Sequence, residues 1–377
     1  MLLELTSLSR EAYHSLISTG NDYVSAVQYL SSELKIRKFY PTLKKFYREP
    51  DLKERLIAAF LEAYPGSLKS SVTKRVQNWI NETSSPRTRE DIYIISFALH
   101  LSEEETSYLL AFVSDYGIHY RDPKDLAYAF CLRTQKTYED AVQFARSLPA
   151  PYSQSQTSDP SAPRTQMIQK AFENIQSEEK FLEQYKNNLE NFGAFHLKAH
   201  DIFSEYYDAL CLLTSKTETS PDYDGEDFKE LPIETIAETY LSLGIPLGKK
   251  RKHLSPVQKM LKDGWPSATT LVNMINKKEN VRRKILLLLY IVTQNISDHQ
   301  YRESDEDYLT AEERLDEHYW ILNSILAECG MNALDPRNSY DWLVLYSLYT
   351  EPDESMEERM RSIIDICFAD YPDALNI

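Results

Sequence analysis

Apolar residues recur along this chain at the spacing of helices. In segment 69–80, Val72, Val76, Trp79 and Ile80 fall at i, i+4, i+7 and i+8, which places their side chains on one helix face. No run shows the convincing alternation of apolar and polar residues that a half-buried strand requires. The pattern therefore predicts helix nearly everywhere and an all-α fold, a multi-helix bundle.

Helix start signals support this prediction. Ser102 with Glu105 and Thr310 with Glu313 match the capping box, in which a hydroxyl and a carboxyl bond the free N–H groups of a first turn. The whole chain contains only 9 Gly. All-β folds and phosphate-binding loops both need glycine at special backbone positions, so this composition argues against both.

The cysteine and hydropathy patterns indicate a location. The four Cys are scattered, without a C-x-x-C pair, as in proteins of a reducing compartment. The N-terminus lacks a basic region followed by an apolar stretch, and the longest apolar run, Ile285–Val292, is far too short to span a bilayer. We expect a cytoplasmic protein without a membrane partner.

Charge is segregated along the chain. The formal net charge is −16, yet Lys35–Arg89 holds 13 Lys and Arg against 5 Asp and Glu, and Lys249–Lys284 holds 11 against 2. Because like charges repel, two basic islands in an acidic chain favour a polyanionic partner such as double-stranded DNA. The alternative is that these cations pair with the acidic surplus elsewhere, inside the chain or in a homodimer.

The first island contains a recognisable order of residues. Trp79-Ile80-Asn81 ends the helix of 69–80, a short turn contains Pro86, and Ala98–Ser102 ends the next helix as Ala-Leu-His-Leu-Ser. This order resembles the back half of a λ-repressor-like (XRE-type) helix-turn-helix domain. The usual Gln-x-x-Leu-Ala helix before the recognition helix is not found here.

The resemblance implies a DNA site in 69–112. Lys74, Arg75 and Asn78 would project from a recognition helix into the major groove, and Arg87 and Arg89 would contact phosphate at the next helix start. The remaining cation of this predicted site is Lys69.

The second island repeats features of the first at a displacement of 195 residues. Asn78 and Asn81 fall on Asn273 and Asn276, and Arg87 and Arg89 fall on Arg282 and Lys284. Chance similarity is the alternative, since Lys and Arg are common. If the duplication is real, the chain could contact two half-sites. The second predicted site comprises Lys277, Lys278, Arg282, Arg283 and Lys284.

Polar stretches divide the chain. Ser147–Thr165 holds four Pro with many Ser and Gln, which is typical of a linker, and Ser215–Pro232 is acidic and polar. The predicted pieces are an N-terminal helical domain 1–148 with the helix-turn-helix-like element 69–112, a linker 149–164, a long helical segment 165–214, and a C-terminal helical domain 232–377 with the second basic element 249–293.

Motifs for catalysis or cofactor binding are weak. His196 and His200 share a helix face at i, i+4, but the sequence lacks the Glu of the H-E-x-x-H pattern, so no metal is expected. Gly244–Lys250 is similar to a P-loop but is one residue short and lacks the Ser/Thr that binds Mg²⁺. We therefore expect no cofactor and no catalysis.

The sequence leads to one function and one alternative. The first is a non-enzymatic DNA-binding regulator of transcription with one or two degenerate helix-turn-helix elements. The alternative is a helical protein–protein interaction module whose helix-turn-helix remnant is purely structural. An exposed basic face would favour DNA, and pairing or burial of the same cations would favour the interaction module. Outside the first island the chain resembles uncharacterised helical bacterial proteins, which implies no activity.

Overall fold

The fold is all-α, as predicted. The computed structural model describes residues 7–151, 165–193, 196–217, 231–246, 254–263, 265–301, 310–351 and 354–369. Over these residues the chain forms 19 α-helices with short 3₁₀ and π turns, and its only β pairing is an isolated bridge between Tyr116 and Met331. None of these helices combines the length and the apolarity that crossing a bilayer requires.

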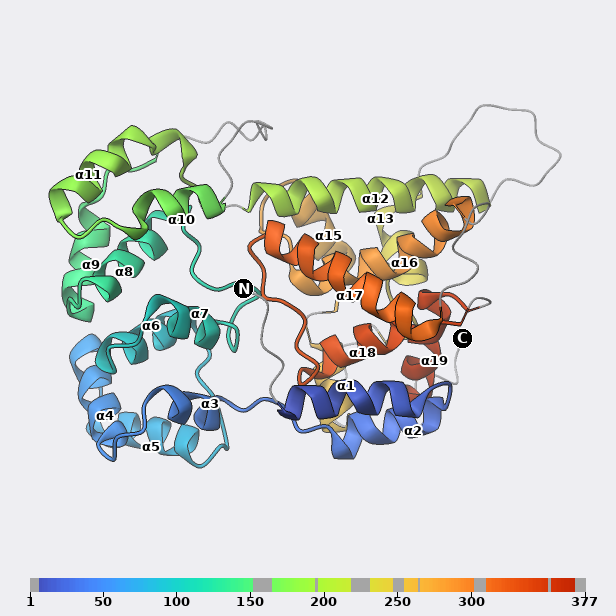
Figure 1. Cartoon of the computed structure of the whole chain (residues 1–377), viewed down its shortest axis with the longest axis horizontal. Helices are drawn as coiled ribbons and strands as arrows, with labels where there is room; N and C mark the ends of the chain where they lie inside the picture. Colours follow the sequence, from blue (N-terminus) through green and yellow to red (C-terminus); the bar gives the residue numbers. More distant parts are fainter. Residues whose placement is uncertain are drawn as a thin grey trace. The chain divides into compact units, whose positions relative to one another are not determined.

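The helices form two compact units, and Figure 1 labels their elements. Unit 1 comprises Met1–Ile36, His196–Cys329 and Ala333–Ile377, and unit 2 comprises Arg37–Phe195 with Gly330–Asn332. The three distant residues join unit 2 because the Asn332 N–H donates to the Asp115 carbonyl (2.9 Å).

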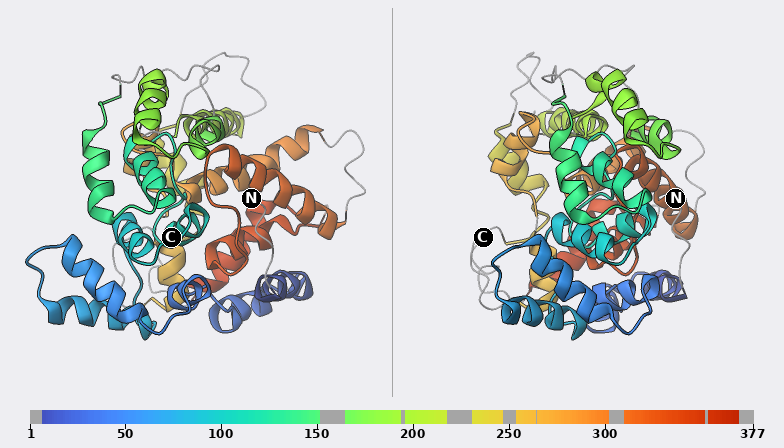
Figure 2. Two further views of the ribbon diagram at one scale, coloured as in Figure 1. Left: turned by 60° about the vertical axis from the view of Figure 1, so that its left-hand side comes forward. Right: turned by 90° about the vertical axis from the view of Figure 1, so that its left-hand side faces the viewer.

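Unit 2 is built on a mixed aliphatic and aromatic core. Its helices are α3 (Phe39–Phe46), α4 (Leu52–Ala63), α5 (Lys69–Ile80), α6 (Arg89–Ala98), α7 (Glu103–Leu110), α8 (Pro123–Arg133), α9 (Tyr138–Ser147), α10 (Thr165–Glu173) and α11 (Glu178–Asn187), with the 3₁₀ turn η2 (Leu189–Asn191). Helices α4 and α5 lie side by side in Figures 1 and 2, and α8 packs against α9. One continuous buried cluster runs from α3 to the residue after η2.

Unit 1 is organised around a helix that is buried on all sides. Its helices are α1 (Ser7–Thr19), α2 (Tyr23–Gln28), α12 (Leu197–Thr217), α13 (Ile233–Thr235), α14 (Pro256–Lys262), α15 (Ala268–Ile275), α16 (Arg283–Tyr301), α17 (Ala311–Glu328), α18 (Ser339–Leu348) and α19 (Met356–Phe368), with the π turns η1 (Tyr29–Glu33) and η3 (Ile236–Tyr240). Every residue of α18 is buried. Helix α12 lies alongside α16.

The units differ from the predicted domains at their N-terminal side. Residues 7–36 join unit 1 because distant side chains of that unit bond the backbone of α1 and of the turn that follows it. Trp342 Nε1 donates to the Ala12 carbonyl (3.2 Å), and Arg359 Nη2 donates to the Gly20 carbonyl (2.6 Å). Unit 2 therefore begins after Ile36, and residue 148 lies inside it.

The predicted helical segment 165–214 is also divided. Its first part belongs to unit 2, because the Phe181 ring packs 4.8 Å from Phe130 and 5.1 Å from Phe144. Its second part, α12, belongs to unit 1. Most of the predicted linker, residues 152–164, lies outside the described residues.

Candidate nucleic-acid interface

The first predicted element folds as two helices joined by a turn. Helix α5 buries Val72, Val76 and Trp79 and ends at Ile80, after which Glu82 takes a left-handed backbone conformation (φ 57°). The Thr88 side chain then accepts the Asp91 N–H and begins α6. This cap fixes the start of α6 and with it the position of Arg89.

The predicted burial of Trp79 is confirmed. Its side chain is 3% exposed, and its ring packs edge-on against Phe60 (5.3 Å) and Phe39 (6.3 Å). Ile92 and Ile95 of α6 belong to the same core.

The outer face of α5 carries polar side chains. Lys69 and Lys74 are exposed, and Asn78 is half-buried. Gln77 lies on this face as well, and its amide donates to the Asn81 side-chain oxygen (2.8 Å). Of the residues predicted to read bases, Lys74 and Asn78 therefore keep positions that a partner could contact.

Arg75 turns toward the core instead. Its guanidinium carbon lies 4.2 Å from the Phe60 ring centre and 5.2 Å from that of Trp79, and Nη1 lies 3.6 Å from the Asp91 carboxylate. Stacking and charge both hold this side chain against its own unit. It contributes less to an outer basic face than the sequence suggested.

Arg87 and Arg89, both predicted to contact phosphate, have different surroundings. The side chain of Arg87 is exposed. Arg89 is held inside unit 2, where it forms an ion pair with Asp125 and donates to the carbonyls of Tyr116 (2.9 Å) and Gly117 (2.8 Å). Burial opposes the charge on Arg89, but the Asp125 carboxylate together with Tyr93 and Tyr116 outweighs burial, so the pKa of the guanidinium is raised. Arg89 is therefore a charged structural residue.

The turn after α15 in the second predicted element has the same backbone geometry as the turn after α5 in the first. After α15, Lys277 takes a left-handed conformation (φ 51°), and the Lys278 N–H donates to the Asn273 carbonyl (2.7 Å). In the first element the equivalent bond runs from Thr83 to Asn78 (3.0 Å). Helices α6 and α8 also end with a left-handed residue, so this geometry alone does not single out the two elements.

The cations of the second element are largely engaged by their own unit. Lys278 is exposed and Lys277 is half-buried. Arg282 lies 3.4 Å from Glu279, and Lys284 Nζ lies 4.5 Å from the Tyr340 ring centre. Residues 249–253 of this island lie outside the described part of the chain.

Arg283 is held in unit 1 by a two-point ion pair. Nη1 lies 2.6 Å from Asp341 Oδ1 and Nη2 lies 2.9 Å from Oδ2, while Nη2 also donates to the Ala333 carbonyl (3.2 Å). Because both side chains are almost fully buried, Arg283 does not project toward a partner.

Arg283 and Arg89 have three bonds in common around their aspartates. Each begins a helix and pairs with an Asp in the first turn of another helix. Each Asp also accepts the N–H of the residue six positions before it, His119 for Asp125 and Asp335 for Asp341, both at 2.9 Å. Each Arg also donates to the carbonyl of the residue eight positions before its Asp. We call each set an arginine clamp.

The clamps change the alignment of the two elements. The displacement of 195 residues matched Arg89 with Lys284, whereas the bonds match it with Arg283. A local signal was present in the sequence, because a cap residue, Asp122 or Asn338, stands three positions before each clamp aspartate. Neither clamp aspartate, Asp125 or Asp341, was predicted from the sequence.

The histidine pair was not expected to bind metal. His196 and His200 are both buried, and His196 Nδ1 lies 3.2 Å from the Cys329 carbonyl. Burial, together with the charge of Lys277, lowers the pKa of His200. Over the described residues no group of three or more His, Cys, Asp or Glu side chains is arranged to hold a metal ion.

No family model, curated protein or solved structure matches this chain. The likeness to XRE-type regulators therefore stays a prediction from the residues that carry it.

Proposed function

We propose that the chain is a non-enzymatic helical protein-interaction module in which the helix-turn-helix elements are structural. The clamps carry this proposal. Arg89 and Arg283 stand at the helix starts from which phosphate contact was expected, and both are bonded inside their own unit. An arginine committed to a buried carboxylate cannot release it for phosphate without leaving an unpaired buried charge.

A docking face for the partner lies on α17 in unit 1. Trp320 is 68% exposed, the largest exposed fraction of the four Trp. Glu313 and Glu317 precede it by seven and three residues, so all three side chains lie on one helix face. Both glutamates are exposed. An exposed Trp flanked by carboxylates suits a basic protein segment that presents an apolar side chain, since Trp often anchors interfaces and charge steers encounter.

Trp320 is also the reporter for the test. The other three, Trp79, Trp265 and Trp342, are buried, so acrylamide should quench mainly Trp320. A synthetic amphipathic Lys/Leu helix should protect this fluorescence, and a Glu/Leu helix of the same pattern should not. Glu313→Gln with Glu317→Gln should weaken the protection, and the same changes at Glu104 and Glu139 of unit 2 are the matched control.

Two outcomes would change the proposal. Equal protection by both peptides, or by neither, would overturn the acidic docking face. Self-association that rises with protein concentration and disappears in Trp320→Ala would identify a second copy as the occupant.

DNA binding remains the second candidate, and the outer face of α5 favours it. Lys74, Gln77 and Asn78 lie there, and Asn and Gln are the side chains that read adenine. The test is a salt titration of binding to mixed genomic DNA fragments. Affinity that falls steeply with salt would support DNA, and no binding at low salt would leave the interaction module.

A further inference from the structure

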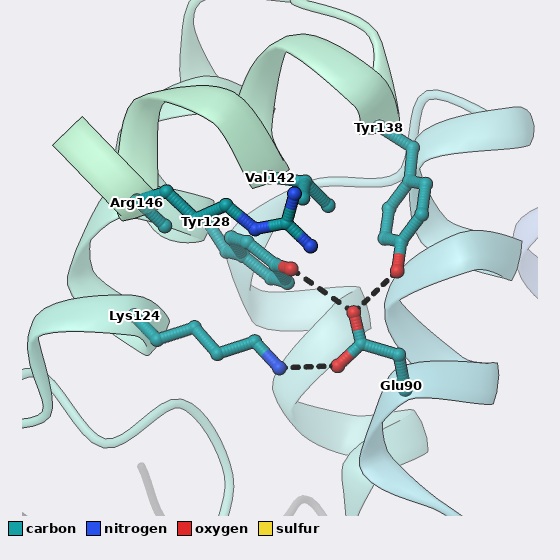
Figure 3. Close-up of a pocket in the computed structure, with 7 residues that line it drawn as sticks. Glu90, Lys124, Tyr128, Tyr138, Val142 and Arg146 are labelled. Carbon is teal, nitrogen blue, oxygen red and sulfur yellow. Dashed lines mark hydrogen bonds and ion pairs between the residues drawn. The ribbon is translucent and has the colours of Figure 1, made fainter. Parts of the chain in front are cut away.

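Unit 2 contains a pocket of about 420 Å³ between α6, α8 and α9. Figure 3 shows its lining, in which charged and aromatic side chains converge from three helices: Glu90 from α6, Lys124 and Tyr128 from α8, and Tyr138 with Arg146 from α9. Val142 and Ala145 complete the wall.

The carboxylate of Glu90 is fully engaged. It accepts from the Tyr128 hydroxyl (3.0 Å), the Tyr138 hydroxyl and the Lys124 ammonium. Burial works against the charge of Glu90, but the bonds from Lys124, Tyr138 and Tyr128 prevail and lower its pKa. The negative charge of Glu90 is therefore balanced by Lys124, and this ion pair adds no net charge to the pocket.

Arg146 gives the pocket a net positive charge. Its side chain is exposed, and among the described residues nothing forms a hydrogen bond or ion pair with its guanidinium. In Figure 3 the guanidinium turns toward the ring of Tyr128 instead of away from the pocket. A guanidinium with a free planar edge suits a carboxylate or a phosphate.

The arginine clamps identify the equivalent place in unit 1. They match α6, α8 and α9 with α16, α18 and α19, and the packing agrees, because α8 packs on α9 as α18 packs on α19, and α6 contacts α9 as α16 contacts α19. Capping boxes at Thr137 and Ser355 set the register of the last pair.

In unit 1 most of the equivalent positions are apolar and buried. Tyr128 corresponds to Val344, and the four lining residues of α9 correspond to side chains of α19 that are at most 2% exposed: Met356, Met360, Ile363 and Ile364. Helix α14 packs against α18 here, and Lys284, the counterpart of Glu90, donates to the Leu261 carbonyl of α14 (3.3 Å). Side chains therefore fill this place between the helices in unit 1, whereas in unit 2 the same place is a pocket.

We propose that the two units are copies of one helical module and that the open copy, unit 2, binds a small organic oxyanion in this pocket. Arg146 holds the carboxylate or phosphate of the ligand. The rings of Tyr128 and Tyr138 with Val142 contact its apolar part, and the bonds from Glu90 keep both rings in place. This site is separate from the docking face on α17.

The test is isothermal titration of the full chain with benzoate and with inorganic phosphate, which distinguishes an aromatic carboxylate from a bare phosphate. Arg146→Ala should weaken binding at least about tenfold, because it removes a charge-assisted contact. Arg87→Ala, which removes an exposed arginine of the same unit outside the pocket, should leave the affinity unchanged.

A second variant tests the comparison of the units. Ala145→Ile installs the residue type that fills the equivalent place in unit 1, Ile363. It should abolish binding while the circular dichroism and thermal midpoint stay at or above those of the unmodified chain. Saturable binding that survives both Arg146→Ala and Ala145→Ile would place the ligand elsewhere. The absence of saturable heat with either anion at concentrations up to about 10 mM would overturn the proposal.

Discussion

Arg283 and Asp341 form a buried two-point ion pair, with Nη1 2.6 Å from Oδ1 and Nη2 2.9 Å from Oδ2. The pair joins the start of α16 to the first turn of α18, the fully buried helix of unit 1. Arg89 and Asp125 join α6 to α8 in unit 2 through a single ion pair of Nη2 with Oδ2. A cation at a helix start opposes the helix dipole, so each arginine depends on its aspartate for compensation.

The first prediction is that breaking a clamp destabilises its unit. Arg283→Met leaves the Asp341 carboxylate buried without its partner and should lower the free energy of unfolding by about 3–5 kcal/mol. Arg282→Met removes a neighbouring, half-exposed ion pair and should cost less than about 1 kcal/mol. Urea unfolding of both variants measures the difference. Equal costs would mean that the buried pair has no special structural role.

The second prediction compares two tryptophans. Trp79→Ala removes a ring packed against Phe60 and Phe39 and should cost about 3–5 kcal/mol of unfolding free energy. Trp320→Ala removes an exposed ring and should change stability by about 0.5 kcal/mol or less. Both values come from chemical denaturation followed by circular dichroism, because fluorescence would lose one of its reporters. A Trp79→Ala cost near that of Trp320→Ala would contradict the packing of α5.

The third prediction separates DNA binding from stability at neighbouring arginines. Arg89→Glu places a second carboxylate beside Asp125 and should destabilise unit 2, whereas Arg87→Glu at an exposed position should leave the unfolding midpoint unchanged. If DNA binds, Arg87→Glu should weaken binding to all sequences alike, and removing the charge should reduce the salt slope by about one unit. Asn78→Ala should instead relax sequence preference, with a loss of about 1–3 kcal/mol.

The second island provides the control for this experiment. Reversal at Arg282 and Lys284 should match the effect of reversal at Arg87 and Arg89 only if two half-sites bind DNA. Since the clamps match Arg89 with Arg283, a loss of binding in Arg89→Glu counts only if the variant remains folded. Unchanged binding in every charge-reversal variant would rule out the predicted DNA-binding sites.

The sequence predicts those structural features that depend on a local pattern of residues. The burial of Trp79 follows from its spacing to Val72 and Val76 within one helix, and the caps at Ser102 and Thr310 are read from four residues each. These features depend on neighbours in the chain, so one sequence is sufficient for them.

The clamps and the unit boundaries depend on distant partners. Arg89 and Asp125 are 36 positions apart, and Arg283 and Asp341 are 58 apart. The sequence therefore indicated two cations available for phosphate, where tertiary packing supplies a carboxylate for each. Residues 7–36 join unit 1 through Trp342 and Arg359, more than 300 positions away from the backbone that they bond, and no local pattern reveals this.

The last prediction concerns pH and His318 in unit 1. Burial, reinforced by the charge of Arg314, lowers the pKa of His318 to about 4, and its Nδ1 lies 2.6 Å from the Tyr290 hydroxyl. The folded protein therefore holds a neutral imidazole, which the unfolded chain would protonate near pH 6.5. Stability from this group is complete above pH 6.5 and is lost as pH falls toward 4, by roughly 2 kcal/mol at pH 5. His318→Gln keeps an acceptor for Tyr290 without a titrating group, so its urea midpoint should fall less between pH 7 and 5 than that of the unmodified chain. The pKa of His200 is also lowered, so His200→Gln measures separately how much this residue contributes to the loss of stability at low pH. Identical pH slopes for the unmodified chain and His318→Gln would show that the imidazole is not held neutral in the fold.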